Sequence, residues 1–160
     1  RYRLQDSPYI YTNGIHGAVV EVDIGTGWIK HLKHWVVEDC GRIINLQLAD
    51  EQIRGGCVQG LGGALYEHCI YDEFGQLQNG TMADYVTPMM TEMPDIQVGH
   101  VETPTSESEL GAKGAGESGT GAAPGVMMNA VNNAIKPLTD GRVTQQPITP
   151  EVVLKALGKI

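Results

Sequence analysis

The sequence has little positive charge and no long apolar run, and both shortages narrow the possible functions. It carries 11 Lys and Arg residues against 19 Asp and Glu residues, a formal net charge of -8, and no cluster of basic side chains. Because nucleic-acid binding relies on positive charge, we expect no partner of that kind. No apolar stretch approaches the ~20 residues of a transmembrane helix, and the first residues do not resemble a secretory signal peptide. We therefore expect a cytoplasmic protein that does not bind a membrane.

Cysteine is scarce as well, and its spacing is unlike that of a disulfide or zinc framework. The three cysteines, Cys40, Cys57 and Cys69, form no close pair, and no histidine lies at ligand spacing from them. An odd number of separated cysteines is typical of free thiols in a reducing compartment. His31 and His34 lie three residues apart in a predicted strand, where side chains at odd spacing face opposite sides. The sequence therefore assigns no metal ligand.

Length and composition fit one globular unit. A chain of 160 residues with 41% hydrophobic residues usually forms a single domain. It contains no repeat, no low-complexity tract and no linker long enough to divide it. We therefore treat residues 1–160 as a single segment, and the start at Arg1 leads us to expect that it belongs to a longer protein. The order of its predicted elements favours an α+β fold over regular βαβ alternation.

The strands are predicted from alternating apolar and polar residues. His16 to Ile24 and Trp28 to Glu38 are separated by Gly25-Thr26-Gly27, which predicts an antiparallel hairpin. A second hairpin is expected over residues 71–81 and a strand over residues 96–101.

The helices are predicted from apolar spacing and from their end signals. One is expected from Asp50 to His68 and another from about Pro124 until Lys136-Pro137. A last helix has Thr149 as its N-cap, Pro150 in its first turn and Gly158 at its end.

Five glycines surround one carboxylate between Gly111 and Gly121, directly before the second predicted helix. Glycine has no Cβ, so this backbone can approach a ligand closely or bend sharply. Glu117 in this loop has the properties of a general base, provided that burial does not raise its pKa. The alternative, a flexible surface loop with an incidental acid, stays open.

Two nucleotide-binding motifs are disfavoured by the residues around them. Gly114, Gly116 and Gly119 match the glycine spacing of the dinucleotide fingerprint, but the residues before them are polar rather than a buried strand. Lys113 is followed by glycine instead of Ser or Thr, so it is not the lysine of a P-loop.

The first predicted helix contains Gly55, Gly56, Gly60, Gly62 and Gly63, each of which costs about 0.5–1 kcal/mol relative to alanine. Close approach of a ligand to this backbone would explain them, with the Gln59 amide as a polar contact. Close helix–helix packing explains them equally well. The Asp39-Cys40-Gly41 sequence at the end of the second strand is ordinary turn chemistry on its own.

Three blocks follow one another along the chain: VVEDCGRIIN (residues 36–45), QIRGGCVQGLGGALYE (52–67) and LGAKGAGESGTGAAP (110–124), the last leading into VMMNAVNNAI. Together they resemble the molybdenum hydroxylases, the family of xanthine dehydrogenases, aldehyde oxidoreductases and carbon monoxide dehydrogenase large subunits. The segments YDEFGQLQNGTMADYVTP and PITPEVVLKAL are also similar to this family. The resemblance covers nearly the whole chain and implies the α+β C-terminal part of the molybdopterin-binding subunit.

The resemblance implies a catalytic role for one residue. Glu117 matches the active-site glutamate of the family, which acts as the base on a hydroxyl or water bound to molybdenum. The implied reaction hydroxylates an electrophilic carbon with water as the source of oxygen. Purines, other N-heterocycles, aldehydes and carbon monoxide all remain open as substrates.

The resemblance also implies cofactor contacts, which fall on Gln59, Lys113, Ala115, Gly116, Asp39, Cys40 and Gly41. The first matches a family glutamine close to the molybdenum cofactor. The next three match the loop that wraps the cofactor. The last three match a segment that lines the pterin or its nucleotide.

The cofactor implied is molybdopterin with molybdenum, expected in its cytosine dinucleotide form. Nothing in the chain resembles an iron–sulfur domain, a flavin domain or the N-terminal half of the molybdenum subunit. We therefore expect [2Fe-2S] clusters and FAD on partner chains, and activity only when these partners are present. One departure is Ile44-Asn45-Leu46, where many relatives have Ile-Asn-Pro.

Two other functions remain as alternatives to an enzyme segment. A non-catalytic module could use the same surface for assembly or cofactor docking, although it would not need to keep Glu117 and Gln59. A nucleotide-binding domain is disfavoured because no strand precedes the glycines.

Overall fold

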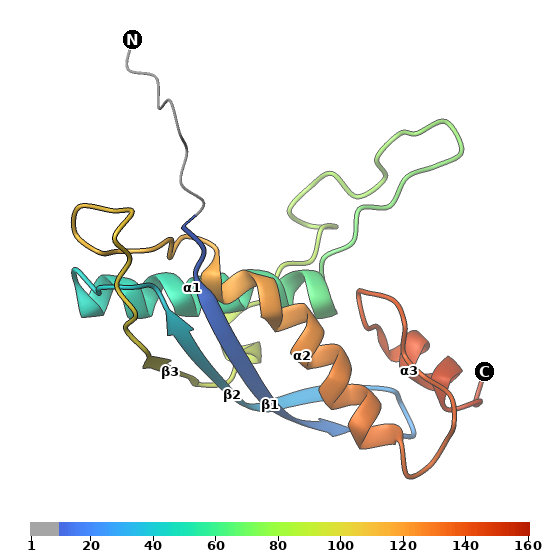
Figure 1. Cartoon of the computed structure of the whole chain (residues 1–160). Coiled ribbons are helices and arrows are strands. Elements are labelled where there is room, and N and C mark those ends of the chain that lie inside the picture. Colours follow the sequence, from blue (N-terminus) through green and yellow to red (C-terminus); the bar gives the residue numbers. More distant parts are fainter. Residues whose placement is uncertain (1–9) are drawn as a thin grey trace.

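The structure is a computed structural model, and it describes residues 10–160. Its elements in chain order are β1 (Asn13–Val22), β2 (Ile29–Asp39), α1 (Leu46–Leu65), a short 3-10 helix (Met90–Glu92), β3 (Ile96–His100), α2 (Ser118–Ile135) and α3 (Pro150–Ala156). β1 pairs antiparallel with β2, and β3 pairs parallel with β2 on its other side. α1 and α2 pack against each other and against the sheet (Figure 1). The predicted α+β fold is confirmed.

Side-chain alternation in β2 decides which face of the sheet the helices cover. His34, Val36 and Glu38 are buried, whereas Trp35 and Val37 on the opposite face are exposed. Val36 packs with Ile53 and Cys57 of α1 and with Ile96 of β3 in one of two hydrophobic clusters, which otherwise contains Cys40. The larger cluster joins α1, α2 and α3 through residues such as Leu61, Met127 and Val153.

The predicted hairpin of β1 and β2 is confirmed, but it contains a bulge that the sequence analysis did not predict. Val19 pairs with Lys33 and Val20 pairs with His31, so Leu32 has no partner in the ladder. One extra residue reverses the alternation of side chains along the strand. The prediction that His31 and His34 face opposite sides is therefore wrong: their rings are in contact, with centroids 5.2 Å apart.

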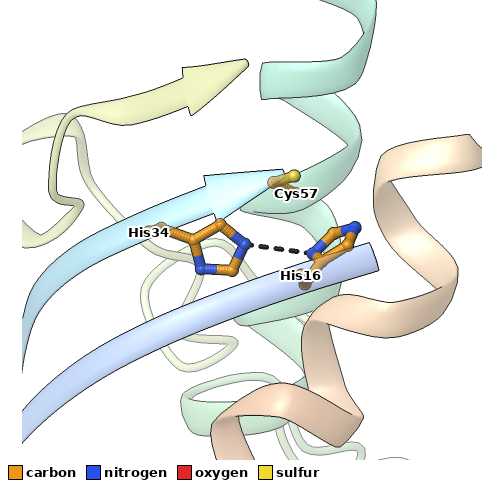
Figure 2. Close-up of side chains that lie close together, drawn as sticks. All are labelled: His16, His34 and Cys57. Atoms are coloured by element: carbon orange, nitrogen blue, oxygen red, sulfur yellow. Dashed lines mark hydrogen bonds between the residues drawn. The ribbon is translucent and has the colours of Figure 1, made fainter. Parts of the chain in front are cut away.

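This bulge places a cluster of histidines in the interior, beside a thiol from α1. Figure 2 shows His16 of β1, His34 of β2 and Cys57 of α1 next to one another. Burial and the nearby His31 and His16 lower the pKa of His34 to about 4. Burial and the nearby Glu38 raise the pKa of the Cys57 thiol to about 12. Both side chains are therefore neutral near pH 7.

Helix α1 begins four residues before the predicted start and ends three residues before the predicted end. Asn45 is its N-cap, because the side chain accepts a hydrogen bond from the amide of Leu48 at 3.1 Å. At the other end the amides of Tyr66 and Glu67 both bond to the carbonyl of Gly62, which closes the last turn.

Helix α2 begins at Ser118, six residues before the predicted start, and Pro124 lies inside it. Proline provides no amide hydrogen to bond the carbonyl of Thr120. That carbonyl faces Gly60 of α1, where a Cβ would come within 2.6 Å of it. The two helices thus meet where their side chains are smallest.

The remaining predictions are confirmed in part. β3 ends one residue before the predicted strand end, and α3 has the predicted N-cap at Thr149. Residues 71–81 form a turn with one antiparallel bridge, between Tyr71 and Leu77, rather than two full strands. Within the described part of the chain, no helix is long and apolar enough to cross a bilayer.

Candidate functional site

The site is built where β2 ends, and Asp39 is its central carboxylate. Its oxygens accept hydrogen bonds from the amide of Gly41 at 3.0 Å and from the amide of Thr103 at 3.1 Å. The Thr103 hydroxyl also donates to Asp39, and the ammonium group of Lys113 lies 3.0 Å from the carboxylate. One side chain therefore joins three segments that are distant in the sequence.

These contacts fix the charge of Asp39. The hydrogen bond from the Thr103 hydroxyl is the largest influence, followed among the stabilising contacts by Lys113 and two backbone amides, and together they hold the pKa of Asp39 well below its usual range. The Lys113 ammonium contacts both Asp39 and Thr103 and is only 12% exposed. Its side chain therefore anchors the glycine loop to β2, and it does not extend toward solvent.

The backbone next to Asp39 forms a short ladder with the start of the glycine loop. Gly41 and Ala112 form an antiparallel bridge, and the amide of Lys113 donates to the carbonyl of Cys40 at 2.8 Å. Gly41 has φ of 66°, and a Cβ there would lie 2.5 Å from the carbonyl oxygen of Gly111. Glycine is required at position 41 for both reasons.

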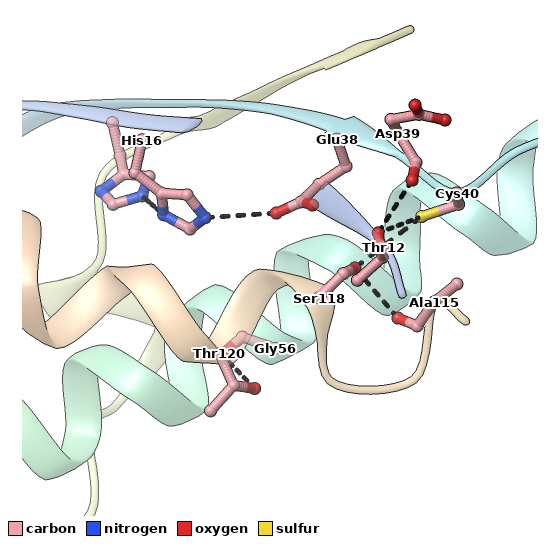
Figure 3. Close-up of polar contacts among 10 residues, drawn as sticks. Thr12, His16, Glu38, Asp39, Cys40, Gly56, Ala115, Ser118 and Thr120 are labelled. Atoms are coloured by element: carbon pink, nitrogen blue, oxygen red, sulfur yellow. Dashed lines mark hydrogen bonds and ion pairs between the residues drawn. The ribbon is translucent and has the colours of Figure 1, made fainter. Parts of the chain in front are cut away.

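The side chain of Cys40 is buried beneath this ladder. Its sulfur lies 3.6 Å from the Thr12 hydroxyl and 3.9 Å from the Ser118 hydroxyl, which itself donates to the carbonyl of Ala115 at 3.1 Å (Figure 3). Cys40, directly after β2, thus links the residue before β1 to the start of α2. Among the predicted contacts, it is a buried packing residue.

Residues 114–117, which we call the open loop, have unused hydrogen-bond donors. Within residues 10–160, none of their four backbone amides donates a hydrogen bond. A Cβ at Gly116 would meet no atom within 4 Å, and one at Gly114 would only touch the carbonyl of Ile10 at 4.0 Å. Ala115 is the exception, because it packs on the buried cluster around Val36. The loop is therefore fixed at its base and open along its length.

Glu117 is the last residue of the open loop and the N-cap position of α2. Its side chain is exposed and makes no hydrogen bond or ion pair with any residue in the described range. The prediction placed it in a loop near the positive end of a helix that begins around Pro124. Because α2 begins at Ser118, the structure places Glu117 directly at the positive end of the helix dipole.

Two glutamines of α1 flank this region. The Gln52 amide donates to the carbonyl of Gly116 at 2.7 Å, which holds the open loop against the helix. Gln59 lies two turns further along, is exposed and makes no hydrogen bond within residues 10–160. The structure therefore brings Asp39, Cys40, Gly41 and Lys113 together but leaves Gln59 apart from them.

A groove of about 370 Å³ lies along the outer side of this junction. Three segments line it: the end of β2 with the connector to α1, the first turns of α1, and the start of the glycine loop. The lining residues are Cys40, Arg42, Ile43, Ile44, Asn45, Leu48, Ala49, Gln52, Ala112, Lys113 and Ala115. Cys40, Lys113 and Ala115 contribute from the predicted set, and Arg42 contributes a positive charge. The groove and the unbonded amides of the open loop can together hold a ligand with several oxygen acceptors.

Two of the residues that organise the site were missed by the sequence analysis. Thr103 lies in a polar stretch without any recognisable pattern, 64 residues from its partner Asp39. Gln52 lies inside a recognised block, and its periodic position on α1 was the available signal. Local spacing can indicate that Gln52 lies on a helix, but it cannot indicate either contact, because each joins residues 64 apart in the sequence.

Comparison with known proteins identifies the family. The sequence model of the molybdopterin cofactor-binding domain matches residues 2–94. The chain belongs to this family. It is 45% identical, over 92% of its length, to the nicotine 6-hydroxylase large subunit of Paenarthrobacter nicotinovorans, of which it covers 18%. It is 34% identical, over 69% of its length, to the carbon monoxide dehydrogenase large chain of Hydrogenophaga pseudoflava, covering 14% of that protein.

The fold agrees with this assignment to the molybdopterin cofactor-binding family. The structure of quinoline 2-oxidoreductase from Pseudomonas putida 86 matches 92% of the chain with a TM-score of 0.88 and 40% identity. The chain covers 19% of that structure, so it spans less than a fifth of the relatives named here. The predicted resemblance to large subunits of molybdenum hydroxylases is confirmed.

Proposed function

We propose that this chain is the catalytic segment of a molybdopterin-dependent hydroxylase, with Glu117 as the general base. The observation that carries the proposal is the state of Glu117: its carboxylate is exposed and has no partner among residues 10–160, and neither do the neighbouring backbone amides. Every other predicted side chain at this junction is bonded or packed within the chain. Glu117 is therefore the acid available to a substrate.

The donor set fits the molybdopterin cofactor. The four consecutive amides of the open loop, which donate no hydrogen bond within residues 10–160, can donate to the oxygens of a phosphate or a pterin. Gly114 and Gly116 leave the space that a closely approaching group would fill. When bound, the cofactor supplies the oxygen-transfer and redox chemistry of the reaction.

The residues of the chain divide into two roles in this proposal. The Asp39–Lys113 pair and Thr103 fix the base of the open loop, so that the loop keeps its shape when the cofactor is released. Glu117 would accept a proton on its carboxylate, since the side chain is exposed. Gln59 would contact the cofactor only if the bound group extends along the exposed face of α1.

The whole enzyme would need further chains. We propose that the remaining part of the molybdenum subunit completes the substrate pocket, while separate iron–sulfur and flavin subunits carry [2Fe-2S] clusters and FAD. The cytosine dinucleotide form of molybdopterin suits the groove beside Arg42, whose exposed side chain offers positive charge to a second phosphate. A small N-heterocycle is the substrate class that we would screen first, because relatives at 45% and 40% identity are named for nicotine and quinoline.

The test is Glu117→Gln in the complete enzyme assembly. Glutamine keeps the size of the side chain but cannot take a proton, so turnover should fall by about 10²–10⁴-fold while the molybdenum content stays the same. Both quantities are measured on the same preparation, with steady-state kinetics and elemental mass spectrometry. Undiminished turnover would remove the assignment of Glu117.

The same experiment tests the alternative of a non-catalytic assembly or cofactor-docking module. In that case Glu117→Gln would leave turnover intact and reduce the yield of assembled complex instead. Gln59→Ala is the companion variant. It should lower molybdenum content if the exposed face of α1 contacts the cofactor.

A further inference from the structure

The interior of the fold contains a second group of polar side chains, unrelated to the open loop. His16 Nδ1 and His34 Nε2 face each other at 3.1 Å. Together with the sulfur of Cys57, one atom from each residue lies within 4.8 Å of the others (Figure 2). His34 and Cys57 are fully buried. Three elements, β1, β2 and α1, each contribute one of these side chains.

We propose that His16, His34 and Cys57 form a buried binding site for one Zn²⁺ ion. Two imidazole nitrogens and one sulfur are the donor types that zinc prefers. In a tetrahedral site with Zn–N bonds of about 2.0–2.1 Å, the two nitrogens would be about 3.3 Å apart. The nitrogens need to separate by only a few tenths of an ångström. The Cys57 sulfur, within 4.8 Å of both, needs to approach them by up to about 1 Å.

A histidine that binds a metal through one ring nitrogen usually bonds a carboxylate or carbonyl through the other. Glu38 provides this partner for His16. Its Oε1 lies 3.3 Å from His16 Nε2 (Figure 3). This contact leaves His16 Nδ1 directed at His34 (Figure 2). A carboxylate that orients a histidine in this way is common around zinc. Gly14 makes room for it, because a Cβ there would overlap the Glu38 carboxylate.

Glu38 is also the observation that calls for a cation. Its side chain is 1% exposed, and its second oxygen has no hydrogen-bond partner among the described residues. An unpaired buried carboxylate oxygen is costly. When the ion binds, a Zn–S bond replaces the S–H bond of Cys57 and the proton leaves to solvent. The charge of the ion is then balanced by the thiolate and Glu38, and no electron is transferred.

A hydrogen-bonded chain of histidines is the competing arrangement. The Lys33 carbonyl only accepts, so the His31 nitrogen that lies 3.1 Å from it carries hydrogen. The chain could then run from His31 through His34 and His16 to Glu38, with a hydrogen on the His34 nitrogen that zinc would need. The two arrangements therefore exclude each other.

The experiment uses the complete assembly that contains this chain. Zinc and molybdenum are measured in the same digest by elemental mass spectrometry after dialysis against a chelator. We expect one zinc per chain, and zinc-edge X-ray absorption should show one sulfur at about 2.3 Å with nitrogens at about 2.0–2.1 Å. Zinc that is absent from a molybdenum-loaded assembly, or that has no sulfur neighbour, overturns the site in favour of the histidine chain.

Variants assign the zinc to this cluster. Cys57→Ser should remove it, and Glu38→Gln should weaken its retention by about 10–100-fold. Cys69→Ser is the matched control, because Cys69 is an exposed free thiol outside the cluster. Zinc that is unchanged in Cys57→Ser overturns the proposal. If that variant does not fold, the absorption spectrum of the unaltered protein decides the question. Because molybdenum is measured separately, failure here is distinguishable from failure of the proposed hydroxylase function.

Discussion

Gly60 and Gly55 both lie in α1, but only at Gly60 does a neighbouring part of the chain leave no room for a larger side chain. A Cβ at Gly60 would lie 2.6 Å from the carbonyl oxygen of Thr120 and 2.9 Å from Ala123. A Cβ at Gly55 would meet nothing within 4 Å. In a helix interior, a glycine without such a contact only loses stability relative to alanine.

The other glycines near the site also divide into those that contact a neighbouring element and those that face open space. Gly56, Gly60 and Gly119, which we call the seam glycines, bring α1 and α2 together, and the Thr120 hydroxyl bonds the Gly56 carbonyl at 3.1 Å. The outer glycines, Gly55 and those of the open loop, face open space. Of the two explanations that the sequence left open, helix packing therefore holds for the seam glycines. The outer glycines have no such contact within residues 10–160, so they are the candidates for close approach of a ligand.

The seam is most directly broken at Gly119. In Gly119→Ala the new Cβ would overlap the carbonyl oxygen of Ile53 and lie 3.0 Å from the amide of Cys57, so α1 and α2 must separate. We expect a loss of about 1–3 kcal/mol, measured as a lower melting temperature of the complete subunit. Gly121→Ala is the control, because a Cβ there has nothing within 4 Å. It should stabilise slightly, and equal losses in both variants would contradict the role of the seam.

The base of the open loop is next in expected effect. Asp39→Asn removes the charge that Lys113 contacts, inside a site where both side chains are 13% exposed or less. We expect a loss of about 1–2 kcal/mol near pH 7, because a buried donor is left with a weaker partner. Thr103→Val, which removes the hydroxyl but keeps the charge pair, should give a smaller loss. A thermal melt of each variant measures both.

The pH dependence of the same variant follows from the lowered pKa of Asp39. A carboxyl whose pKa is lower in the folded than in the unfolded state stabilises the fold above its unfolded value of about 4. That stabilisation is lost as the pH falls from there toward the folded value. The difference in melting temperature between the unaltered chain and Asp39→Asn should therefore be constant from pH 7 to about 5 and shrink below about pH 4. A constant difference down to pH 3 would mean that Asp39 is not held in its charged form.

Strands and helices with strong periodicity could be predicted from the sequence, and interruptions of that periodicity could not. β1, β2 and β3 lie close to their predicted ranges because half-buried strands alternate. The bulge at Leu32 has no marker in its own residue type, and it reversed the expected directions of His31 and His34. The start of α2 could not be predicted, because its glycines and Pro124 have low helix propensity. In the structure, packing against α1 overrides that low propensity.

The site residues likewise divide into those that local sequence patterns could indicate and those that they could not. The glycine loop and Asp39-Cys40-Gly41 could be selected from sequence blocks, and the structure joins them through Lys113. Thr103 could not be selected, because its partner lies 64 residues away and nothing local reports the contact. The role of Glu117 stays a prediction. It rests on family resemblance and on the side chain, which is exposed and has no partner among residues 10–160.

The outer glycines give the smallest effect on stability and the sharpest test of what lies outside the chain. Gly116→Ala should change stability by less than about 0.5 kcal/mol, because its Cβ would point into open space. If the open loop holds the molybdenum cofactor, the same methyl group would occupy the space of the closest approach, and molybdenum and pterin content should fall in the complete assembly. Gly125→Ala, an equally open position on the outer side of α2, should lower neither. Unchanged cofactor content in Gly116→Ala would favour the flexible-surface-loop interpretation. If cofactor content falls in Gly116→Ala but not in Gly125→Ala, Gly116 faces the ligand, whereas Gly125 only lies at the surface.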